Sequence, residues 1–426
     1  MSEDISLKIL EDREKRSEFI NNCLNEYSVC TIKANYPSED KNNYIAWALV
    51  GIFEKVFENN IDGLFEIADK LILDGFDGRC IVYSFDKKYD CNILKNIGIN
   101  IEENHELGRY IDIDVYDYDT KKALSRGLLR KCILCDDYAI VCARNKKHDI
   151  NEIIDKIEFD VKRFLEIEVK KLINYSCMVE LNLKYKFGLV TPYHPHKDMD
   201  YNLMVKAYQT LIYPFLEMFS LGFELDNLEE LNKHLHLEGK RAEYLMYKET
   251  KGVNCYKGLI FLLGMFLGGL GYSIKNQRFL KEVLKELNKD VLSEYEDETI
   301  QTFGAKSYRE YGFLGARGEA YNGFINVFKN CDELNNYSDL ELYRLLINLV
   351  RDVDDTVLLK RSGSMEKYKY YKNLISNVNY NDLEDIQIKT LECERNDISI
   401  GGCADIFVIT VFFSLFKKNF RIEGLF

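Results

Sequence analysis

From Ile150 to the end of the chain, apolar residues recur three and four positions apart, and the alternating pattern of a strand is nearly absent. This spacing places apolar side chains on one face of each of a series of helices. The chain has only 4 prolines in 426 residues, so few of these helices are expected to be interrupted. The larger part of the chain is therefore predicted to fold as an all-α domain.

The first third of the chain mixes patterns typical of strands and of helices. The predicted strands are Val29–Ala34, Cys80–Tyr83, Tyr110–Val115 and Ala139–Cys142. The predicted helices are Ile9–Leu24, Ile45–Val56 and Ile150–Val169. A chain of this length exceeds what one hydrophobic core usually organises. We therefore predict a multidomain protein, with an α+β domain over residues 1–170 and an all-α domain over residues 171–426.

Charge and composition exclude several classes of protein. The formal net charge is -13, which disfavours a nucleic-acid-binding protein because such proteins need a basic face. The apolar runs Gly258–Tyr272 and Ala404–Phe416 are shorter than the roughly 20 residues of a membrane-spanning helix, so both are predicted to be buried helices. The 12 cysteines are scattered, and the acidic start of the chain has no apolar leader segment. We therefore expect a cytoplasmic protein with no nucleic-acid or membrane partner.

Two carboxylates, Asp112 and Asp114, lie one residue apart inside the apolar run Leu107–Val115. In a strand they point to the same face, where two like charges repel unless a cation lies between them. Magnesium favours one or two carboxylates together with substrate phosphates, and Arg109 lies where it can meet a phosphate. The pattern indicates phosphoryl or nucleotidyl transfer. The alternative is a solvated edge strand that carries acids by chance.

Cys132 and Cys135 form a C-x2-C pair, and Cys142 and His148 follow it. Three thiolates and one imidazole can bind zinc tetrahedrally. Small, partly buried residues around a strand-loop-strand unit are the favoured alternative, because neither flank carries the turn glycines expected beside a zinc knuckle. A local excess of basic residues indicates a phosphate-rich ligand or an acidic partner, or else a solvated loop face. These residues are Arg126, Arg130, Lys131, Arg144, Lys146 and Lys147.

Several segments of the second half join glycine to charged or amide side chains just before a helix. The free backbone N–H groups of such helix starts can hold an anion. One such segment alone is ordinary helix capping, but several in one helical domain indicate a phosphate-bearing ligand. The segments are Lys186–Thr191, His196–Asp200, Thr250–Gly258, Gly315–Ala320, Asp354–Gly363 and Ser399–Asp405.

The N-terminal part, from about Leu7 to Glu166, resembles the apo-citrate-lyase phosphoribosyl-dephospho-coenzyme-A transferases, also called holo-citrate-lyase synthases. Where that family usually carries a glycine after its Asn-x-Pro segment, this chain has Ser38. The resemblance implies a nucleotidyltransferase-like domain. It rests on Glu11–Arg16, Asn35–Pro37 with Lys41, Gly108–Val115, Ser125-Arg126, Arg130–Cys135, and Cys142–Arg144 with His148.

The C-terminal part, from about Leu172, resembles the triphosphoribosyl-dephospho-coenzyme-A synthase family. Four positions depart from the family pattern. Tyr256 stands for a histidine, Phe187 for a proline, Val357 for an asparagine and Cys403 for a serine. The resemblance rests on Gly188–Val190, His196–Asp200, Glu243 with Met246 and Thr250, Gly252–Asn254 with Lys257-Gly258, Arg317–Glu319, Asp355-Thr356 with Arg361, and Gly401-Gly402 with Ala404-Asp405.

The two resemblances together imply a bifunctional enzyme that makes and attaches the prosthetic group of citrate lyase. The C-terminal domain would join ATP to 3'-dephospho-coenzyme A with release of adenine. The N-terminal domain would transfer the phosphoribosyl-dephospho-coenzyme-A group to a serine of the citrate lyase acyl carrier protein, the gamma subunit, with release of pyrophosphate. Alternatives are the equivalent malonate decarboxylase maturation enzyme and a non-catalytic factor that binds dephospho-coenzyme A and the carrier protein. The sequence leaves the oligomeric state open.

The implied site residues fall into three groups. The catalytic candidates are Asp112, Asp114, Arg109, Glu243 and Asp198. The candidates for holding the nucleotide substrates are Arg126, Arg130, Lys197, Asn254, Lys257, Arg317, Arg361, Gly401 and Gly402. The candidates for binding magnesium are Asp112, Asp114, Asp200, Glu319, Asp354, Asp355 and Asp405.

Overall fold

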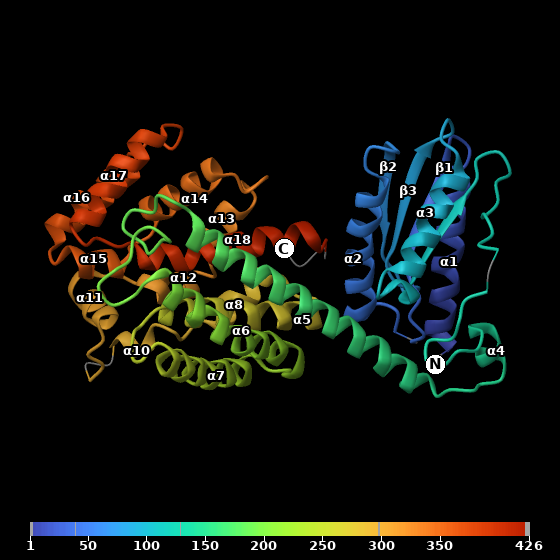
Figure 1. The fold of residues 1–426 in the computed structure, drawn as a ribbon. Coiled ribbons are helices and arrows are strands. Elements are labelled where there is room, and N and C mark those ends of the chain that lie inside the picture. Colours follow the sequence, from blue (N-terminus) through green and yellow to red (C-terminus); the bar gives the residue numbers. More distant parts are fainter. Residues whose placement is uncertain (1–2, 39, 128, 297–298, 422–426) are drawn as a thin grey trace. The chain divides into compact units, whose positions relative to one another are not determined.

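The computed structural model describes residues 3–38, 40–127, 129–296 and 299–421. The chain divides into two compact units, shown as ribbons in Figure 1. Unit 1 takes in the chain up to Leu165 together with a short segment that begins at Lys417, and unit 2 runs from Glu166 to Phe416. Helix α5 (Ile150–Asn182), 33 residues long, begins in unit 1 and ends in unit 2.

Unit 1 is built on a four-stranded antiparallel sheet with the strand order β2-β3-β1-β4. β4 is therefore an edge strand, paired with β1 so that Lys33 lies opposite Asp112 and Thr31 opposite Asp114. Residues that are directly opposite in a sheet point to the same face, so these four side chains share one face. The strands are β1 (Tyr27–Ala34), β2 (Ile67–Leu73), β3 (Cys80–Asp86) and β4 (Ile111–Tyr116).

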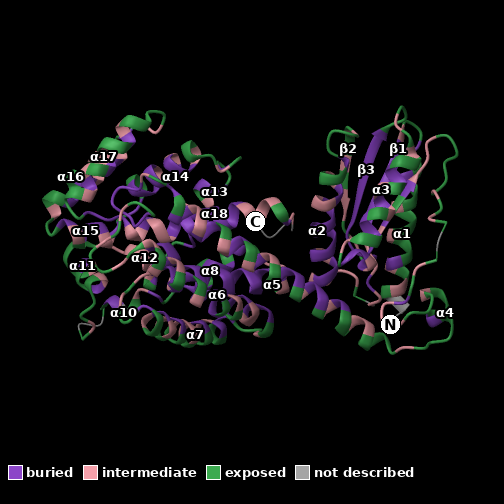
Figure 2. Cartoon of the chain, viewed as in Figure 1, coloured by how far each residue is buried: buried purple, intermediate pink, exposed green. Residues whose placement is uncertain are grey.

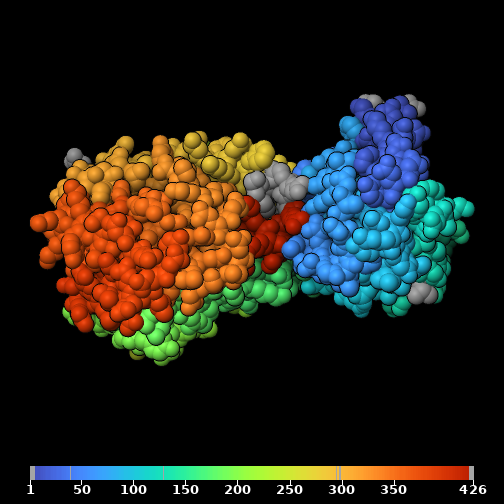
Figure 3. Space-filling view, turned by 90° about the horizontal axis from the view of Figure 1, so that it is seen from above, coloured from blue at the N-terminus to red at the C-terminus, as the bar shows by residue number. Residues whose placement is uncertain are grey.

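Three helices cover the two faces of this sheet (Figure 1). Helices α2 (Tyr44–Ile61) and α3 (Cys91–Asn104) pack against each other and against the fully buried side chains of one face. Helix α1 (Glu3–Cys23) covers the other face, where Ile20 packs on Val29. Figure 3 shows the first turns of α1, in dark blue, standing out from the rest of unit 1. The face that carries Asp112 and Asp114 is thus the α1 face.

Most of the predicted elements of unit 1 are confirmed, but one is wrong. The segment Ala139–Cys142 was expected to be a strand, and it forms helix α4 (Ala139–Arg144). A short apolar run cannot be assigned by periodicity alone. Here the backbone N–H groups of Val141 and Cys142 donate to the carbonyl of Tyr138, 3.0 and 3.1 Å away, which starts the helical turn. Strand β2 and helix α3 were not predicted from the sequence.

All regular secondary structure in the described part of unit 2 is helical, as predicted. Figure 2 shows exposed outer faces on α7, α16 and α17 and a buried interior around α8. The helices after α5 are α6 (Tyr201–Glu224), α7 (Leu228–Glu249), α8 (Lys257–Asn276), α9 (Leu280–Leu287), α10 (Ser293–Glu296), α11 (Phe303–Tyr311), α12 (Gly315–Tyr321), α13 (Ile325–Cys331), α14 (Asp339–Asp352), α15 (Thr356–Ser362), α16 (Met365–Ser376), α17 (Leu383–Arg395) and α18 (Gly401–Asn419).

Helix α8 is the central helix of unit 2. It packs against α6, α7, α9 and α12, and Phe266 makes edge-to-face contacts with Phe412 and Phe413 of α18. By length and composition α8 is long and apolar enough to cross a membrane, but 83% of its most apolar window is buried inside the protein. We therefore describe α8 as a core helix. Because α8 and α18 are held together by this core, their first turns are fixed relative to each other.

Candidate active sites

Each of the two carboxylates on β4 has a cationic neighbour. Nη1 of Arg130 contacts Oδ1 of Asp112, and Nη2 of the same side chain lies 2.8 Å from Glu102 Oε1. Nζ of Lys95 lies 3.5 Å from Oδ1 of Asp114. Burial raises the pKa of Asp112, the charge of Arg130 opposes that rise, and the charge of Asp114 adds to it. The pair is thus an electrostatically strained site that a further cation would stabilise.

Four cationic side chains converge on one buried carboxylate, Asp77, in the loop before β3. The distances to its oxygens are 3.0 Å from Arg13 Nε, 2.5 Å from Arg16 Nη1 and 3.4 Å from Lys41 Nζ, and Lys33 Nζ also contacts it. The Asp77 side chain is 1% exposed. We call these four cations and Asp77 the cationic cluster. It carries more positive charge than its one carboxylate can neutralise.

The cationic cluster lies beside the carboxylates of β4. Lys33 belongs to the cluster, and it faces Asp112 across the β1–β4 pairing. Burial alone would raise the pKa of Asp77, but the hydrogen bonds from Lys33 and Arg16 outweigh it and hold that pKa well below its usual value. Asp77 therefore stays ionised, and the surplus of positive charge next to Asp112 favours a polyanionic ligand.

Two other arginines proposed from sequence, Arg109 and Arg126, are not members of the cationic cluster. Arg126 is held by two carboxylates, with Nη1 2.6 Å from Glu102 Oε2 and Nη2 3.0 Å from Glu103 Oε1. Arg109 lies on the short helix η1 (Gly108–Tyr110), which leads into β4. The structure thus brings Asp112, Asp114 and Arg130 together and keeps Arg126 engaged with glutamates.

Unit 2 contains a cavity of about 640 Å³ at the first turns of α8 and α18. Its lining combines acidic side chains with Lys257, Lys360 and Arg361. Backbone N–H groups at the start of a long helix favour an anion, and two such helices begin here. The residues proposed from sequence that line this cavity are Asp198, Asn254, Lys257, Asp354, Asp355, Arg361, Gly401, Gly402 and Asp405.

Asp355 and Asp405 are placed by glycines in the helices beside them. Asp355 accepts hydrogen bonds from the backbone N–H groups of Val357, at 2.7 Å, and of Cys403, at 2.9 Å. A Cβ at Gly402 would lie only 2.8 Å from Asp355 Oδ1, and a Cβ at Gly258 would overlap the carboxylate of Asp405. Both glycines are therefore required for the carboxylates to reach the helix starts.

The acidic side of the cavity is electrostatically crowded. Burial raises the pKa of Asp405 well above its ordinary value, and the charges of Asp355 and Glu180 raise it further. Glu180 comes from α5, and its Oε1 accepts a 2.7 Å hydrogen bond from the buried Lys186. Carboxylates that destabilise one another in this way form a site that a divalent cation would stabilise.

Two polar side-chain atoms in the cavity wall, one hydroxyl oxygen and one ring nitrogen, lack a hydrogen-bond partner within the described residues. One is the hydroxyl of Tyr256, whose side chain is buried at the start of α8. The other is Nδ1 of His196, which lies 3.6 Å from Asp397 Oδ1, beyond hydrogen-bond distance. Burial lowers the pKa of His196, and the charge of Arg361 lowers it further. His196 is therefore neutral near pH 7, and no described residue satisfies the hydrogen-bonding capacity of either group.

Comparison with known proteins identifies both units. The family model for ATP:dephospho-CoA triphosphoribosyl transferase matches residues 167–424. The chain belongs to this family. The family model for apo-citrate lyase phosphoribosyl-dephospho-CoA transferase matches residues 6–164. The chain is therefore a fusion of the two transferases, as predicted, and we call unit 1 the transferase unit and unit 2 the synthase unit.

Relatives with the same pair of domains cover nearly the whole chain. A relative named Protein CitXG from Leuconostoc mesenteroides subsp. cremoris is 26% identical over 461 residues, which cover 95% of this chain and 96% of the relative. A second Protein CitXG, from Haemophilus influenzae, is 29% identical and covers 78% of each chain. A probable 2-(5''-triphosphoribosyl)-3'-dephosphocoenzyme-A synthase from Vibrio cholerae is 31% identical over 216 residues, 46% of this chain and 69% of the relative. These matches do not favour the malonate decarboxylase alternative.

Five proposed residues of the synthase unit lie outside its cavity. Glu243 pairs with Lys257 at 2.8 Å. Glu319 is buried, and its oxygens accept the side-chain amide of Asn326 and the backbone N–H groups at the start of α13. Arg317 lines a separate cavity and donates to the carbonyl of Val291 at 3.0 Å. The last two, Lys197 and Asp200, line a shallow neighbouring groove, and Asp200 caps α6.

Three residues that the site prediction omitted are Asp77, Glu180 and His196. His196 lies in a segment that was singled out, but three neighbours, Lys197, Asp198 and Asp200, were chosen instead. Glu180 lies inside a long helix, where no local motif marks it. Asp77 lies between two glycines, Gly75 and Gly78, and this spacing is the one signal that could have found it.

Proposed function

We propose that the synthase unit joins ATP to 3'-dephospho-coenzyme A in the cavity at the starts of α8 and α18. The observation that carries this proposal is the combination, in one cavity, of crowded carboxylates, three basic side chains and two helix starts. A nucleoside triphosphate needs this combination, because its phosphates are anionic and its ribose becomes cationic in the transition state. Lys257, Arg361 and the backbone at Gly401 would hold the triphosphate.

The donor set on the acidic side fits magnesium, which prefers carboxylate oxygens and substrate phosphates. Asp355 and Asp405 would hold the ion, and it would neutralise the triphosphate and the repulsion between the two carboxylates. Asp354 and Asp198 lie in the same lining and are further candidates. The wider set proposed from sequence is thereby reduced to the carboxylates that share one cavity.

The reaction exchanges one bond at the ribose of ATP. The ribose 2'-hydroxyl oxygen of 3'-dephospho-coenzyme A forms a bond to C1 of the ATP ribose, and the bond from C1 to adenine breaks. The hydroxyl loses one proton and the departing adenine takes up one proton on nitrogen, so the reaction releases no net proton. We propose neutral His196 as the acceptor, because it lines the cavity with a free ring nitrogen. Tyr256 would donate a hydrogen bond to the substrate in place of the family's histidine.

We propose nucleotidyltransferase-like chemistry for the transferase unit, on the α1 face of the sheet. The serine oxygen of the acyl carrier protein would form a bond to the phosphorus next to the ribose, the bond to pyrophosphate would break, and the serine proton would pass to solvent or to pyrophosphate. Asp112 and Asp114 would bind magnesium, which would neutralise charge on the phosphates. The cationic cluster and Arg130 would hold the pyrophosphate. Asp77 would then hold the four cationic side chains of the cluster together before substrate binds.

The two activities can be assayed separately, which tests both proposals on the intact chain. Adenine release needs ATP and 3'-dephospho-coenzyme A but no carrier protein. Labelling of the carrier protein from triphosphoribosyl-dephospho-coenzyme A made beforehand needs no ATP. A variant of one unit should change one assay alone.

We also propose a reducing, cytoplasmic setting, which fits the 12 cysteines, all of them free thiols.

Tyr256→Phe is expected to lower the kcat of adenine release about tenfold, because it removes one hydrogen bond to the substrate. Tyr256→His should keep at least the activity of the phenylalanine variant and restore part of the loss. The thermal midpoint of Tyr256→Phe should not fall, since the hydroxyl has no partner to lose. Unchanged kcat in Tyr256→Phe would show that this hydroxyl does not meet the substrate.

The basic surface on α4 is the proposed contact for the carrier protein, which we expect to be acidic. Arg144 and Lys146 are exposed there, beside the exposed apolar side chains Ile140 and Val141. Arg144→Glu is expected to raise the KM for the carrier protein about fivefold at low ionic strength, with kcat unchanged, and high salt should remove the difference. Lys88→Glu, an exposed site in the turn after β3, is the matched control. Equal KM values for the two variants would contradict the assignment.

A further inference from the structure

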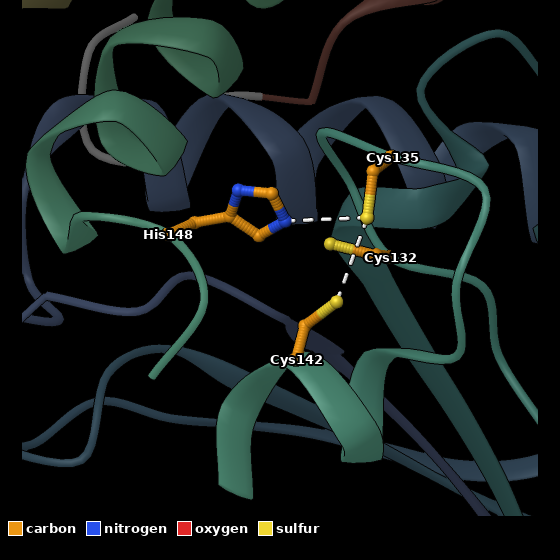
Figure 4. A group of neighbouring side chains, drawn as sticks. All are labelled: Cys132, Cys135, Cys142 and His148. Atoms are coloured by element: carbon orange, nitrogen blue, oxygen red, sulfur yellow. Dashed lines mark hydrogen bonds between the residues drawn. The ribbon is translucent and has the colours of Figure 1, made fainter. Parts of the chain in front are cut away.

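Four side chains that can bind a soft metal gather at one point of the transferase unit (Figure 4). The sulfurs of Cys132, Cys135 and Cys142 and one ring nitrogen of His148 all lie within 4.8 Å of one another. Cys135 Sγ lies 3.5 Å from Cys142 Sγ and 3.2 Å from His148 Nε2. Cys132 and Cys142 are buried. Neither proposed reaction uses these groups.

The spacing of the four atoms is that of a tetrahedral zinc site. Zinc–sulfur bonds of about 2.3 Å place two sulfurs of a tetrahedron about 3.8 Å apart, with a slightly shorter distance from sulfur to nitrogen. The sulfur–sulfur distance of 3.5 Å is far longer than a disulfide bond of about 2.05 Å, and all the cysteines are free thiols. The set supplies four protein ligands, which is typical of a structural site and leaves no position for a substrate.

The backbone around these residues is arranged to aim them at one another without glycine. An antiparallel bridge between Lys131 and Tyr138 closes the loop that carries the first two cysteines. Helix α4 presents Cys142 and ends at Arg144, and two residues later Lys146 adopts a left-handed φ of 48°. The N–H of Lys147 then donates to the carbonyl of Cys142 at 3.0 Å, and the chain turns back toward His148. Lys146 thus adopts the left-handed backbone conformation that glycine usually adopts after a helix.

We propose that Cys132, Cys135, Cys142 and His148 bind one structural zinc ion. The ion joins the loop from Lys131, helix α4 and the segment before α5 into one rigid piece. Arg130 lies directly before this loop, and its carbonyl accepts the N–H of Ala139 at 2.8 Å. Zinc therefore fixes the backbone of the arginine that contacts Asp112, and it also fixes the basic surface on α4.

The first test is metal analysis of the whole protein, purified without chelator from cells grown with zinc. About one zinc ion per chain is expected. After removal of zinc under reducing conditions, added cobalt(II) should produce the intense visible and near-ultraviolet bands of a tetrahedral thiolate site. Zinc below about a tenth of an ion per chain, together with no such bands on cobalt addition, would overturn the proposal. A Cys135–Cys142 disulfide in freshly prepared protein would overturn it as well.

The second test uses variants and both assays. Cys135→Ser and Cys142→Ser should each lose most of the metal, and Cys91→Ser, a partly exposed cysteine outside the cluster, should keep it. Removing zinc from the unchanged protein should lower carrier-protein labelling and leave adenine release unchanged, and restored zinc should recover the labelling. Metal retained by Cys135→Ser and Cys142→Ser at the level of Cys91→Ser would contradict the assignment of the ligands.

Discussion

Asp114→Asn is expected to lower the rate of carrier-protein labelling about a hundredfold to a thousandfold, with adenine release unchanged. The side chain of Asp114 is 52% exposed and points to the face that carries Lys33 and Asp112, so it can reach a magnesium ion and the phosphates. The asparagine keeps the size of the side chain but loses the charge that the ion needs. Labelling is followed by the intact mass of the carrier protein, starting from triphosphoribosyl-dephospho-coenzyme A made beforehand.

The matched control for this variant is Asp69→Asn. Asp69 is an exposed aspartate on β2, the opposite edge strand of the same sheet. The Asp69→Asn variant should label the carrier protein at the normal rate. If Asp114→Asn also labelled at the normal rate, the α1 face would not be the site of transfer.

Asp405→Asn is expected to lower adenine release by a similar factor while making the metal-free protein more stable at neutral pH. Asp405 is crowded by Asp355 and Glu180, and folding raises its pKa, so the folded state loses stability as the pH rises through that raised pKa. Asparagine does not ionise, so the variant does not lose this stability as the pH rises. The stability difference should therefore vanish below about pH 4, where the aspartate is protonated in both the folded and the unfolded state. Thermal midpoints in chelator across this pH range measure it.

Asp339→Asn, at an exposed position in the first turn of α14, is the control for the synthase unit. It should change neither adenine release nor the pH profile of stability. Adenine release retained in Asp405→Asn would remove Asp405 from the proposed magnesium site. A lower thermal midpoint at neutral pH would show that its carboxylate is paired in the folded protein.

Local sequence patterns predicted only part of the arrangement that the structure shows at the proposed transferase site. The alternation of β4 correctly placed Asp112 and Asp114 on one face, and the basic residue Arg130 does contact that face. Arg13, Arg16 and Lys41 belong to the motifs on which the family resemblance rests, yet nothing in their spacing indicates that they converge on Asp77. The convergence of these side chains on Asp77 depends on how α1 and two loops pack. This packing cannot be predicted from local patterns in one sequence.

The synthase cavity shows the same limit. The glycine pair before an apolar run predicted a helix start, and α18 does begin at Gly401, because helix capping is a local property. Glu319 has a carboxylate beside a glycine as well, but it caps α13 and does not line the synthase cavity. Glu180 and Asp405 come from helices far apart in the sequence, so their closeness in one cavity depends on the tertiary fold. The all-α character was predictable from periodicity, whereas the short α4 was not.

The central claim is that one chain both makes the prosthetic group and attaches it. The most direct measurement supplies the purified protein with ATP, 3'-dephospho-coenzyme A, magnesium and apo carrier protein, and follows adenine together with the intact mass of the carrier protein. We predict adenine release and a carrier protein heavier by one phosphoribosyl-dephospho-coenzyme-A group. Binding of 3'-dephospho-coenzyme A and the carrier protein without adenine release or added mass would contradict the account and identify a non-catalytic binding factor.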